Sequence, residues 1–266
     1  MKHYKTVLTI AGSDSGGGAG IQADIKSISA TGGYAASAVT AITVQNTLGV
    51  QSVSPVDIST IVGQIEAVLS DIGAEAVKVG MLHSAEVVTA VAETLKRFNV
   101  RNIVVDPVMV STSGHRLIEE EAILALKREL IPIARVITPN IPEAEILSGK
   151  KIGSQDELPE IAKALSMGGR VSVLLKAGHL TEESLTDVFY NAESASIIKL
   201  TSKRLNTCNT HGTGCTLSSA FASYLAQGAS LDEAARAAKA YITKAIAKGA
   251  DYEIGHGWGP VNHFFL

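Results

Sequence analysis

The sequence predicts an α/β fold in which a central, mostly parallel β-sheet is flanked by helices on both faces. Short apolar runs rich in β-branched residues recur, as in 6–12 and 171–179, and such runs are typical of strands buried on both faces. Helical patterns lie between many of these runs, which indicates crossover connections between parallel strands. Hydrophobic residues make up 46% of the 266 residues and no linker-like tract interrupts them, so one domain is expected over 1–266.

Each element is predicted from its own pattern. Within 84–98, for example, Val87, Val88, Val91 and Leu95 recur at helical spacing. Strands are expected at 6–12, 37–46, 75–81, 102–110, 135–140, 171–179 and 184–191. Helices are expected at 58–70, 84–98 and 213–227, and a further helix is expected to begin within the glycine-rich stretch 10–26.

Composition excludes several classes of protein. The net charge of −3 predicts neither nucleic acid nor an anionic membrane surface as a partner. No stretch approaches the roughly 18 apolar residues of a membrane span, and the first apolar run is too short for a signal peptide, so a cytoplasmic location is expected. Cys208 and Cys215 are seven residues apart and lack zinc-ligand spacing, which argues against a disulfide framework or structural zinc.

The stretch 10–26, IAGSDSGGGAGIQADIK, contains a match to a dinucleotide-binding pattern in Gly18, Gly20 and Ala23. The first glycine of that match lies well past the strand end, and 38–46 contains no ribose-binding acid, so this interpretation is rejected. Two interpretations stay open. The stretch is either a glycine loop before a helix, or a substrate loop in which Asp14 or Asp24 supplies a polar contact.

A second glycine-rich segment, Gly212-Thr213-Gly214, precedes the helix predicted at 213–227. The first amides of a helix lack internal partners and carry partial positive charge, so this segment predicts an anion site that stabilises a transferring phosphoryl group. Cys215 would then lie in the first turn, where the helix end lowers a thiol pKa, and could serve as a base or nucleophile. A small buried apolar role is the alternative. His211 either contacts phosphate or only shapes the loop.

Other candidates follow predicted strands. Asn140 and Glu143 have the spacing of Mg²⁺ ligands, but also that of a helix cap with a first-turn acid. Asp106 could hold metal-bound water, and Lys176 is costly to bury unless it is paired or faces phosphate. The small polar loop 110–117 is expected to act as a flap. The P-loop pattern is absent from the sequence, so a phosphotransferase of this kind would bind phosphate differently.

Four segments together resemble the hydroxymethylpyrimidine/phosphomethylpyrimidine kinases of thiamine biosynthesis, which belong to the ribokinase-like superfamily. They are IAGSDSGGGAGIQADIK (10–26), TAITVQNT (40–47), DPVMVSTSG (106–114) and NTHGTGCTLSSA (209–220), and the tail GHGWGPVNHFF (255–265) also fits. The resemblance covers essentially the whole chain. One departure is Gly16, where that family frequently has serine.

The resemblance implies one ribokinase-like domain, usually a homodimer, that transfers a phosphoryl group from ATP with Mg²⁺. The acceptor would be 4-amino-5-hydroxymethyl-2-methylpyrimidine and then its monophosphate. The implied substrate residues are Gln45, Asp24, Gly12, Met81 and Val108. Cys215 would be the base, and Gly212, Thr213 and Gly214 the anion hole. Asp106, Asn140 and Glu143 would surround Mg²⁺, with Lys176, Asn140 and His211 at the nucleotide.

Two rival functions remain. A pyridoxal or pyridoxine kinase of the same superfamily would act on a similar aromatic alcohol, but should not convert a pyrimidine monophosphate to the diphosphate. A non-catalytic pyrimidine-binding module would keep the pocket without consuming ATP. The presence of Cys215, Asn140, Glu143 and Lys176 argues against the second rival.

Overall fold

A computed structural model describes residues 2–109 and 118–265. Within these residues one nine-stranded sheet runs in the order β3-β2-β1-β4-β5-β6-β7-β8-β9. The strands are β1 (Thr6–Asp14), β2 (Tyr34–Asn46), β3 (Gly49–Pro55), β4 (Ala76–Val79), β5 (Ile103–Val105), β6 (Val136–Ile137), β7 (Ser172–Leu175), β8 (Ser184–Asn191) and β9 (Ser196–Lys203). The six strands from β2 to β7 in this order pair in parallel, while β3, β8 and β9 are antiparallel additions at the two edges. The predicted mostly parallel sheet is confirmed.

Helices connect most of these strands. They are α1 (Gly20–Ala30), α2 (Ile58–Ala67), α3 (Ala85–Arg97), α4 (Glu120–Ala125), α5 (Ile141–Ser148), α6 (Leu158–Leu165), α7 (Thr213–Ala226) and α8 (Leu231–Gly249). Short helical turns extend α2 over Val68–Ile72 and α4 over Leu126–Leu130, and others lie at Ile131–Ile133 and Gln155–Glu157. The predicted helices correspond to α1, α2, α3 and α7, whereas α4, α6 and α8 were not predicted.

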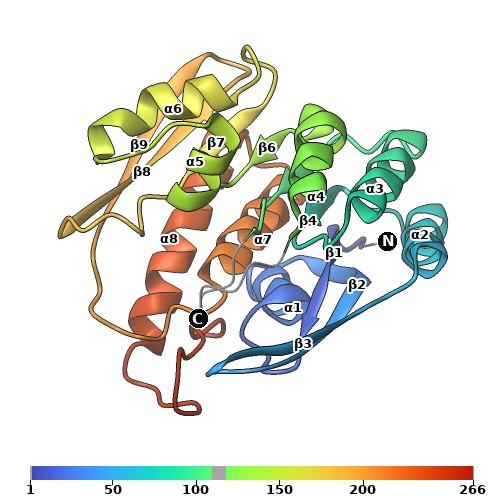
Figure 1. The fold of residues 1–266 in the computed structure, drawn as a ribbon, viewed down its shortest axis with the longest axis horizontal. Coiled ribbons are helices and arrows are strands. Elements are labelled where there is room, and N and C mark those ends of the chain that lie inside the picture. Colours follow the sequence, from blue (N-terminus) through green and yellow to red (C-terminus); the bar gives the residue numbers. More distant parts are fainter. Residues whose placement is uncertain (1, 110–117, 266) are drawn as a thin grey trace.

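The helices form a layer on each face of the sheet (Figure 1). Residues of α2 to α6 share one apolar core with one face of the sheet, and α1, α7 and α8 share a second core with the other. Side chains alternate across a strand, so Val77 and Val79 of β4 enter the first core while Ala76 enters the second. Lys78 therefore points toward α1 and α7.

The strand order places a ligand site at the carboxyl ends of the central strands. β1 lies between β2 and β4: the chain passes from β1 to β2 on one side, and the later connection from β3 to β4 crosses to the other side. Ligands in such sheets bind beyond the carboxyl ends of the strands, at the point where the order reverses. The predicted flap, 110–117, lies outside the described residues. Among the helices that are described, none is both long and apolar enough to cross a membrane.

Candidate active site

A cleft of about 800 Å³ opens beyond the carboxyl ends of the central strands. Its walls include the following predicted site residues: Gly12, Gln45, Met81, Asp106, Val108, Asn140, Glu143, Lys176, His211, Gly212, Thr213, Gly214 and Cys215. Residues far apart in the chain thus line one cavity, because the carboxyl ends of the parallel strands lie on the same side of the sheet. Of the predicted site residues, Asp24 alone is outside this lining.

Asp24 differs from the prediction because it is fully buried under the cleft. Its carboxylate accepts hydrogen bonds from Thr9 Oγ1 at 2.6 Å and Ser219 Oγ at 2.7 Å, and it forms an ion pair with Lys78, whose Nζ is 2.9 Å from both oxygens. These partners come from β1, α7 and β4, while Asp24 belongs to α1. Asp24 therefore ties two helices to the sheet instead of lining the pocket.

Sequence reasoning missed Lys78, which lines the cleft although its side chain is not solvent-exposed. Burial alone would lower the pKa of its ammonium group, but the carboxylate of Asp24, together with Cys215 and Asp106, raises that pKa. Lys78 therefore remains a cation within the protein. The available signal was a lysine inside the apolar strand pattern AVKV.

Asp106 and Lys176 form a second charged pair in the cleft. Asp106 follows β5, Lys176 follows β7, and Nζ of the lysine lies 3.0 Å from Oδ1 of the aspartate. Thr138 Oγ1 also donates to Oδ1 at 3.0 Å. Burial favours the neutral acid, yet the cations of Lys176 and Lys78 hold the Asp106 pKa below its usual value. The cleft thus contains a fixed carboxylate beside a lysine that can face phosphate.

Asn140 and Glu143 form the capping box of α5. Asn140 Oδ1 accepts from the Glu143 amide at 2.9 Å, and Glu143 Oε2 accepts from the Asn140 amide at 2.8 Å. The capping interpretation is therefore confirmed, and both residues nevertheless line the cleft. Burial and the charge of Asp106 raise the pKa of Glu143 to about 7, against the opposing effect of Lys176.

The acidic residues fit a cation held mainly by other ligands. Within the described residues, no three His, Cys, Asp or Glu side chains are grouped so that they could bind a metal by themselves. Asp106 and Glu143 are close enough for one carboxylate to shift the pKa of the other. Mg²⁺ typically takes one or two carboxylates and completes its shell with water and substrate phosphates. This donor set suits Mg²⁺ arriving with a nucleotide.

The glycines before α7 bring the start of the helix against the charged pair. Gly212 adopts φ +77°, and a Cβ there would lie 1.8 Å from the carbonyl oxygen of Gly18. A Cβ at Gly214 would lie 3.2 Å from Lys176 Nζ and 3.3 Å from Asp106 Oδ2. No side chain caps this helix end. The positive end of α7 and Lys176 therefore face the same part of the cleft, as an anion site requires.

The environment of Cys215 differs from the prediction. Burial raises the pKa of its thiol to about 12, and the carboxylates of Asp24 and Asp106 act in the same direction. The cation of Lys78 and the amide of Gly20 oppose this shift but do not overcome it. The thiol of Cys215 is therefore neutral at physiological pH. Both cysteines are free, in agreement with the prediction that they form no disulfide.

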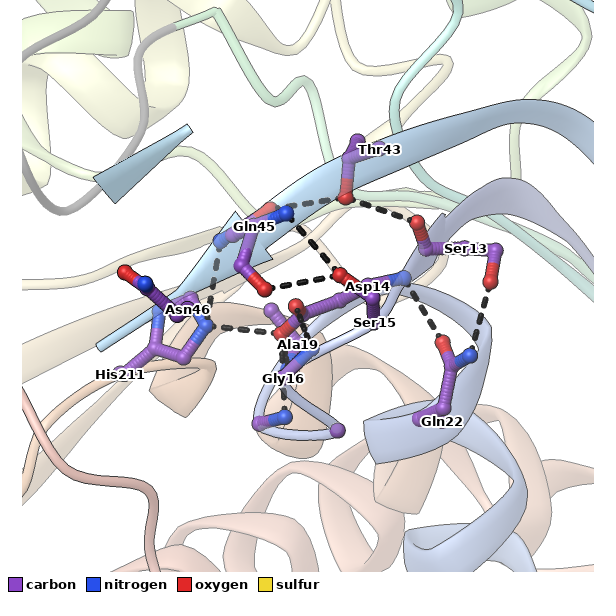
Figure 2. A network of polar contacts seen from close by, with 12 residues as sticks. Ser13, Asp14, Ser15, Gly16, Ala19, Gln22, Thr43, Gln45, Asn46 and His211 are labelled. Atoms are coloured by element: carbon purple, nitrogen blue, oxygen red, sulfur yellow. Dashed lines mark hydrogen bonds and ion pairs between the residues drawn. The ribbon is translucent and has the colours of Figure 1, made fainter. Parts of the chain in front are cut away.

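The glycine loop after β1 is folded around the carboxylate of Asp14 (Figure 2). Oδ1 accepts from the Gly16 amide at 2.8 Å, and Oδ2 accepts from the amides of Gly18 at 3.0 Å and Ala19 at 2.8 Å. His211 Nε2 also lies 2.9 Å from Oδ2 and 3.3 Å from Gln45 Nε2. Asp14 therefore shapes the loop, and His211 joins it to the end of β2. A contact of His211 with phosphate stays a prediction.

With this geometry established, comparison with known proteins gives a consistent result. The family model described as phosphomethylpyrimidine kinase matches residues 14–262. The chain belongs to the phosphomethylpyrimidine kinase family. The hydroxymethylpyrimidine/phosphomethylpyrimidine kinase of Rhizobium meliloti is 49% identical to it, over 97% of this chain and 96% of that protein. The family makes the chain a phosphotransferase.

Two solved structures show how far the ribokinase-like fold is shared. The crystal structure of phosphomethylpyrimidine kinase from Clostridium difficile is 46% identical, with a TM-score of 0.79 over 91% of this chain and 99% of that chain. Pyridoxal kinase from Staphylococcus aureus in complex with ADP is 35% identical, with a TM-score of 0.90 over 99% of this chain and 94% of that chain. The fold is therefore shared with a phosphomethylpyrimidine kinase and with a pyridoxal kinase.

Proposed function

We propose that this kinase transfers the γ-phosphoryl group of ATP to 4-amino-5-hydroxymethyl-2-methylpyrimidine and then to the resulting monophosphate. The observation that carries the proposal is that one cleft contains two kinds of wall. Gln45 and Met81 provide an amide and an apolar surface for a ring, and Lys176 with the start of α7 provides an anion site. The 49% identity, over 97% of this chain, to a kinase named for both hydroxymethylpyrimidine and phosphomethylpyrimidine supports the same substrates.

The nucleotide would lie toward Lys176. Its ammonium group and the first amides of α7 are placed to neutralise charge on the transferring phosphoryl group. Asp106 and Glu143 would hold Mg²⁺ together with water and phosphate oxygens, with Asn140 keeping Glu143 in place through the capping box. When bound, the ion would supply further positive charge at the phosphates.

The ring of the substrate would lie between Gln45 and Met81. Gly12 permits this because a Cβ there would be 2.8 Å from Met81 Cε, so the bare backbone leaves room for the methionine. Val108 adds a second apolar wall. Gln45 would hydrogen-bond the edge of the pyrimidine, leaving the hydroxymethyl group directed toward the anion site.

Cys215 would accept the hydroxymethyl proton as the oxygen bonds to the γ-phosphorus and the bond to the β-phosphate oxygen breaks. Because the thiol is neutral, its own proton must first pass to solvent through the cleft that Cys215 lines. Lys78 and the amide of Gly20 favour the thiolate in the structure, and the partial positive charge at the start of α7 acts in the same direction. Substitution Cys215→Ala should then lower kcat far more than it raises KM, and a near-normal kcat would leave Cys215 as a wall of the pocket.

A product assay tests the proposed function. Purified protein is incubated with ATP, Mg²⁺ and either the pyrimidine alcohol, its monophosphate or pyridoxal, and the products are identified by mass spectrometry. We expect pyrimidine diphosphate from both pyrimidine substrates. Pyridoxal phosphate as the sole product would instead identify the protein as a pyridoxal kinase. This second candidate function is supported by the TM-score of 0.90 to a pyridoxal kinase.

We also propose that the chain forms a homodimer. Ile42 and Val44 are 54% and 51% exposed, and alternation along β2 places them on the same face near the β3 edge of the sheet. Burial of that face between two copies would remove these apolar side chains from water. Light scattering should give the mass of two chains, and Val44→Lys should shift it to one; a wild-type mass of one chain would contradict the proposal.

A further inference from the structure

The Asp14 carboxylate is the fixed point of the network at the ring end of the cleft. Its side chain is 3% exposed, and its oxygens accept three backbone N–H groups from the glycine loop. Burial favours the neutral acid, but the hydrogen bonds from His211, Ala19 and Gly16 outweigh it and lower the Asp14 pKa. Asp14 is therefore ionised and can only accept hydrogen bonds.

This fixes the proton on His211. Nε2 of its ring lies 2.9 Å from Asp14 Oδ2, and an ionised carboxylate has no proton to donate. Nε2 must therefore carry hydrogen and donate it to Asp14. The ring is held there by the backbone, because the His211 amide donates to the Gly259 carbonyl at 3.0 Å. A Cβ at Gly18 would lie 2.4 Å from the ring, so this glycine leaves room for it.

The proton on His211 in turn selects the orientation of the Gln45 carboxamide. One end of this amide lies 3.3 Å from His211 Nε2, and the other lies 3.1 Å from Thr43 Oγ1. If the NH₂ group faced the histidine, two donors would meet. The oxygen of the amide would then also need the one hydroxyl proton of Thr43, although Thr43 lies 2.9 Å from the Ser13 carbonyl, to which it donates.

The opposite orientation gives each of these contacts one donor and one acceptor. Gln45 Oε1 faces His211 and accepts from Nε2–H, which it shares with Asp14. Gln45 Nε2 then donates to Thr43 Oγ1, and Thr43 keeps its own proton for the Ser13 carbonyl. The two ends of a carboxamide have nearly the same size, so the choice depends on hydrogen-bond partners alone.

We propose that His211, held by Asp14, is a positioning residue that sets the orientation of the Gln45 carboxamide and thereby the kind of ring edge that the cleft accepts. The proposal rests on the proposed function, in which Gln45 contacts the pyrimidine. The outer edge of a carboxamide presents one acceptor and one donor in a fixed order. An aminopyrimidine edge, with NH₂ beside a ring nitrogen, complements only one order, whereas pyridoxal lacks this edge.

The first experiment measures the proton directly, without substrate. Nitrogen NMR of the labelled protein at neutral pH distinguishes a histidine with hydrogen on Nε2 from one without, and the His211 signals are assigned as those lost in His211→Gln. We expect hydrogen on Nε2. A ring with bare Nε2 would overturn the proposal, whether or not the pyrimidine is the substrate.

The second experiment compares two replacements of similar length. His211→Gln keeps an N–H near the position of Nε2, and His211→Met does not. We expect His211→Gln to change KM for the pyrimidine alcohol by less than about threefold, and His211→Met to raise it about tenfold with a smaller change in kcat. KM for pyridoxal should change by less than about threefold in both variants.

Equal effects of the two variants, or equal effects of His211→Met on both ring substrates, would overturn the proposal. The control is His3→Ala, which removes an exposed histidine outside the cleft and should match the wild type. If the wild type does not phosphorylate the pyrimidine alcohol, the proposed function fails, and the NMR result still decides the orientation of Gln45.

Discussion

The ammonium nitrogen of Lys78 lies 2.9 Å from each carboxylate oxygen of Asp24, and neither side chain is exposed to solvent. Breaking such a pair leaves one charge buried without a partner. We therefore expect Lys78→Met to lower the free energy of unfolding by about 3–5 kcal/mol in urea titrations. The double variant Lys78→Met/Asp24→Asn should lose less than Lys78→Met alone. A double variant with a greater loss than the single one would contradict the pairing.

Gly212 and Gly63 provide a matched test of the loop before α7. Gly212→Ala forces a side chain at φ +77° into the Gly18 carbonyl, so it should lower stability by more than about 1 kcal/mol and reduce activity. Gly63 lies within α2 with open space around its Cβ position, and Gly63→Ala should raise stability by about 0.5–1 kcal/mol. Thermal unfolding of both variants checks the contrast, and similar shifts would refute it.

The two free cysteines should differ in reactivity. The neutral thiol of Cys215, with its pKa near 12, should react with iodoacetamide far more slowly at pH 7.5 than the exposed Cys208. Peptide mass spectrometry after timed labelling gives both rates in one sample. Faster labelling of Cys215 would mean that the start of α7 outweighs burial and that the thiolate already exists in the free enzyme.

Glu143 should make stability depend on pH. Its pKa is raised to about 7 in the folded protein, from a usual value of 4.5, so the folded state retains a proton that the unfolded state loses between these values. The contribution of Glu143 is therefore complete below pH 4.5 and declines as pH rises toward 7, by at most about 1.4 kcal/mol per pH unit. Glu143→Gln cannot ionise, so its stability relative to wild type should increase over this range. Urea titrations without Mg²⁺ should show this, and a constant difference would contradict the raised pKa.

The central fold followed from apolar patterns because the parallel strands are buried on both faces. The patterns failed where burial is partial. β3 is exposed or half-buried throughout, and β9 alternates between buried and exposed residues, so neither forms a continuous apolar run. The start of α8 does carry a sequence signal for a helix. Ser230 and Glu233 form a capping box at its start, with the spacing that predicts a helix N-terminus.

The site was predictable where residues directly follow strands, as Asp106 and Lys176 do, because the sheet itself brings those positions together. Asp24 and Cys215 show what sequence spacing cannot supply. The ion pair of Asp24 and part of the shift in the Cys215 pKa both involve Lys78. The direction of the Lys78 side chain follows from the alternation of β4 and the packing of α1 and α7. The thiol pKa depends on burial, which a position at a helix start does not reveal. The contact between His211 and Gln45 was likewise not predictable from the sequence, because it depends on how the loop before α7 packs against the end of β2.

The most direct test of the account is the conversion of the pyrimidine monophosphate. The purified protein is given ATP, Mg²⁺ and hydroxymethylpyrimidine monophosphate, and product formation is followed by mass spectrometry against a Lys176→Met control. The account predicts pyrimidine diphosphate with stoichiometric ADP, and a strong loss of both in the control. Pyrimidine monophosphate left unchanged, while pyridoxal is readily phosphorylated by the same preparation, would contradict it.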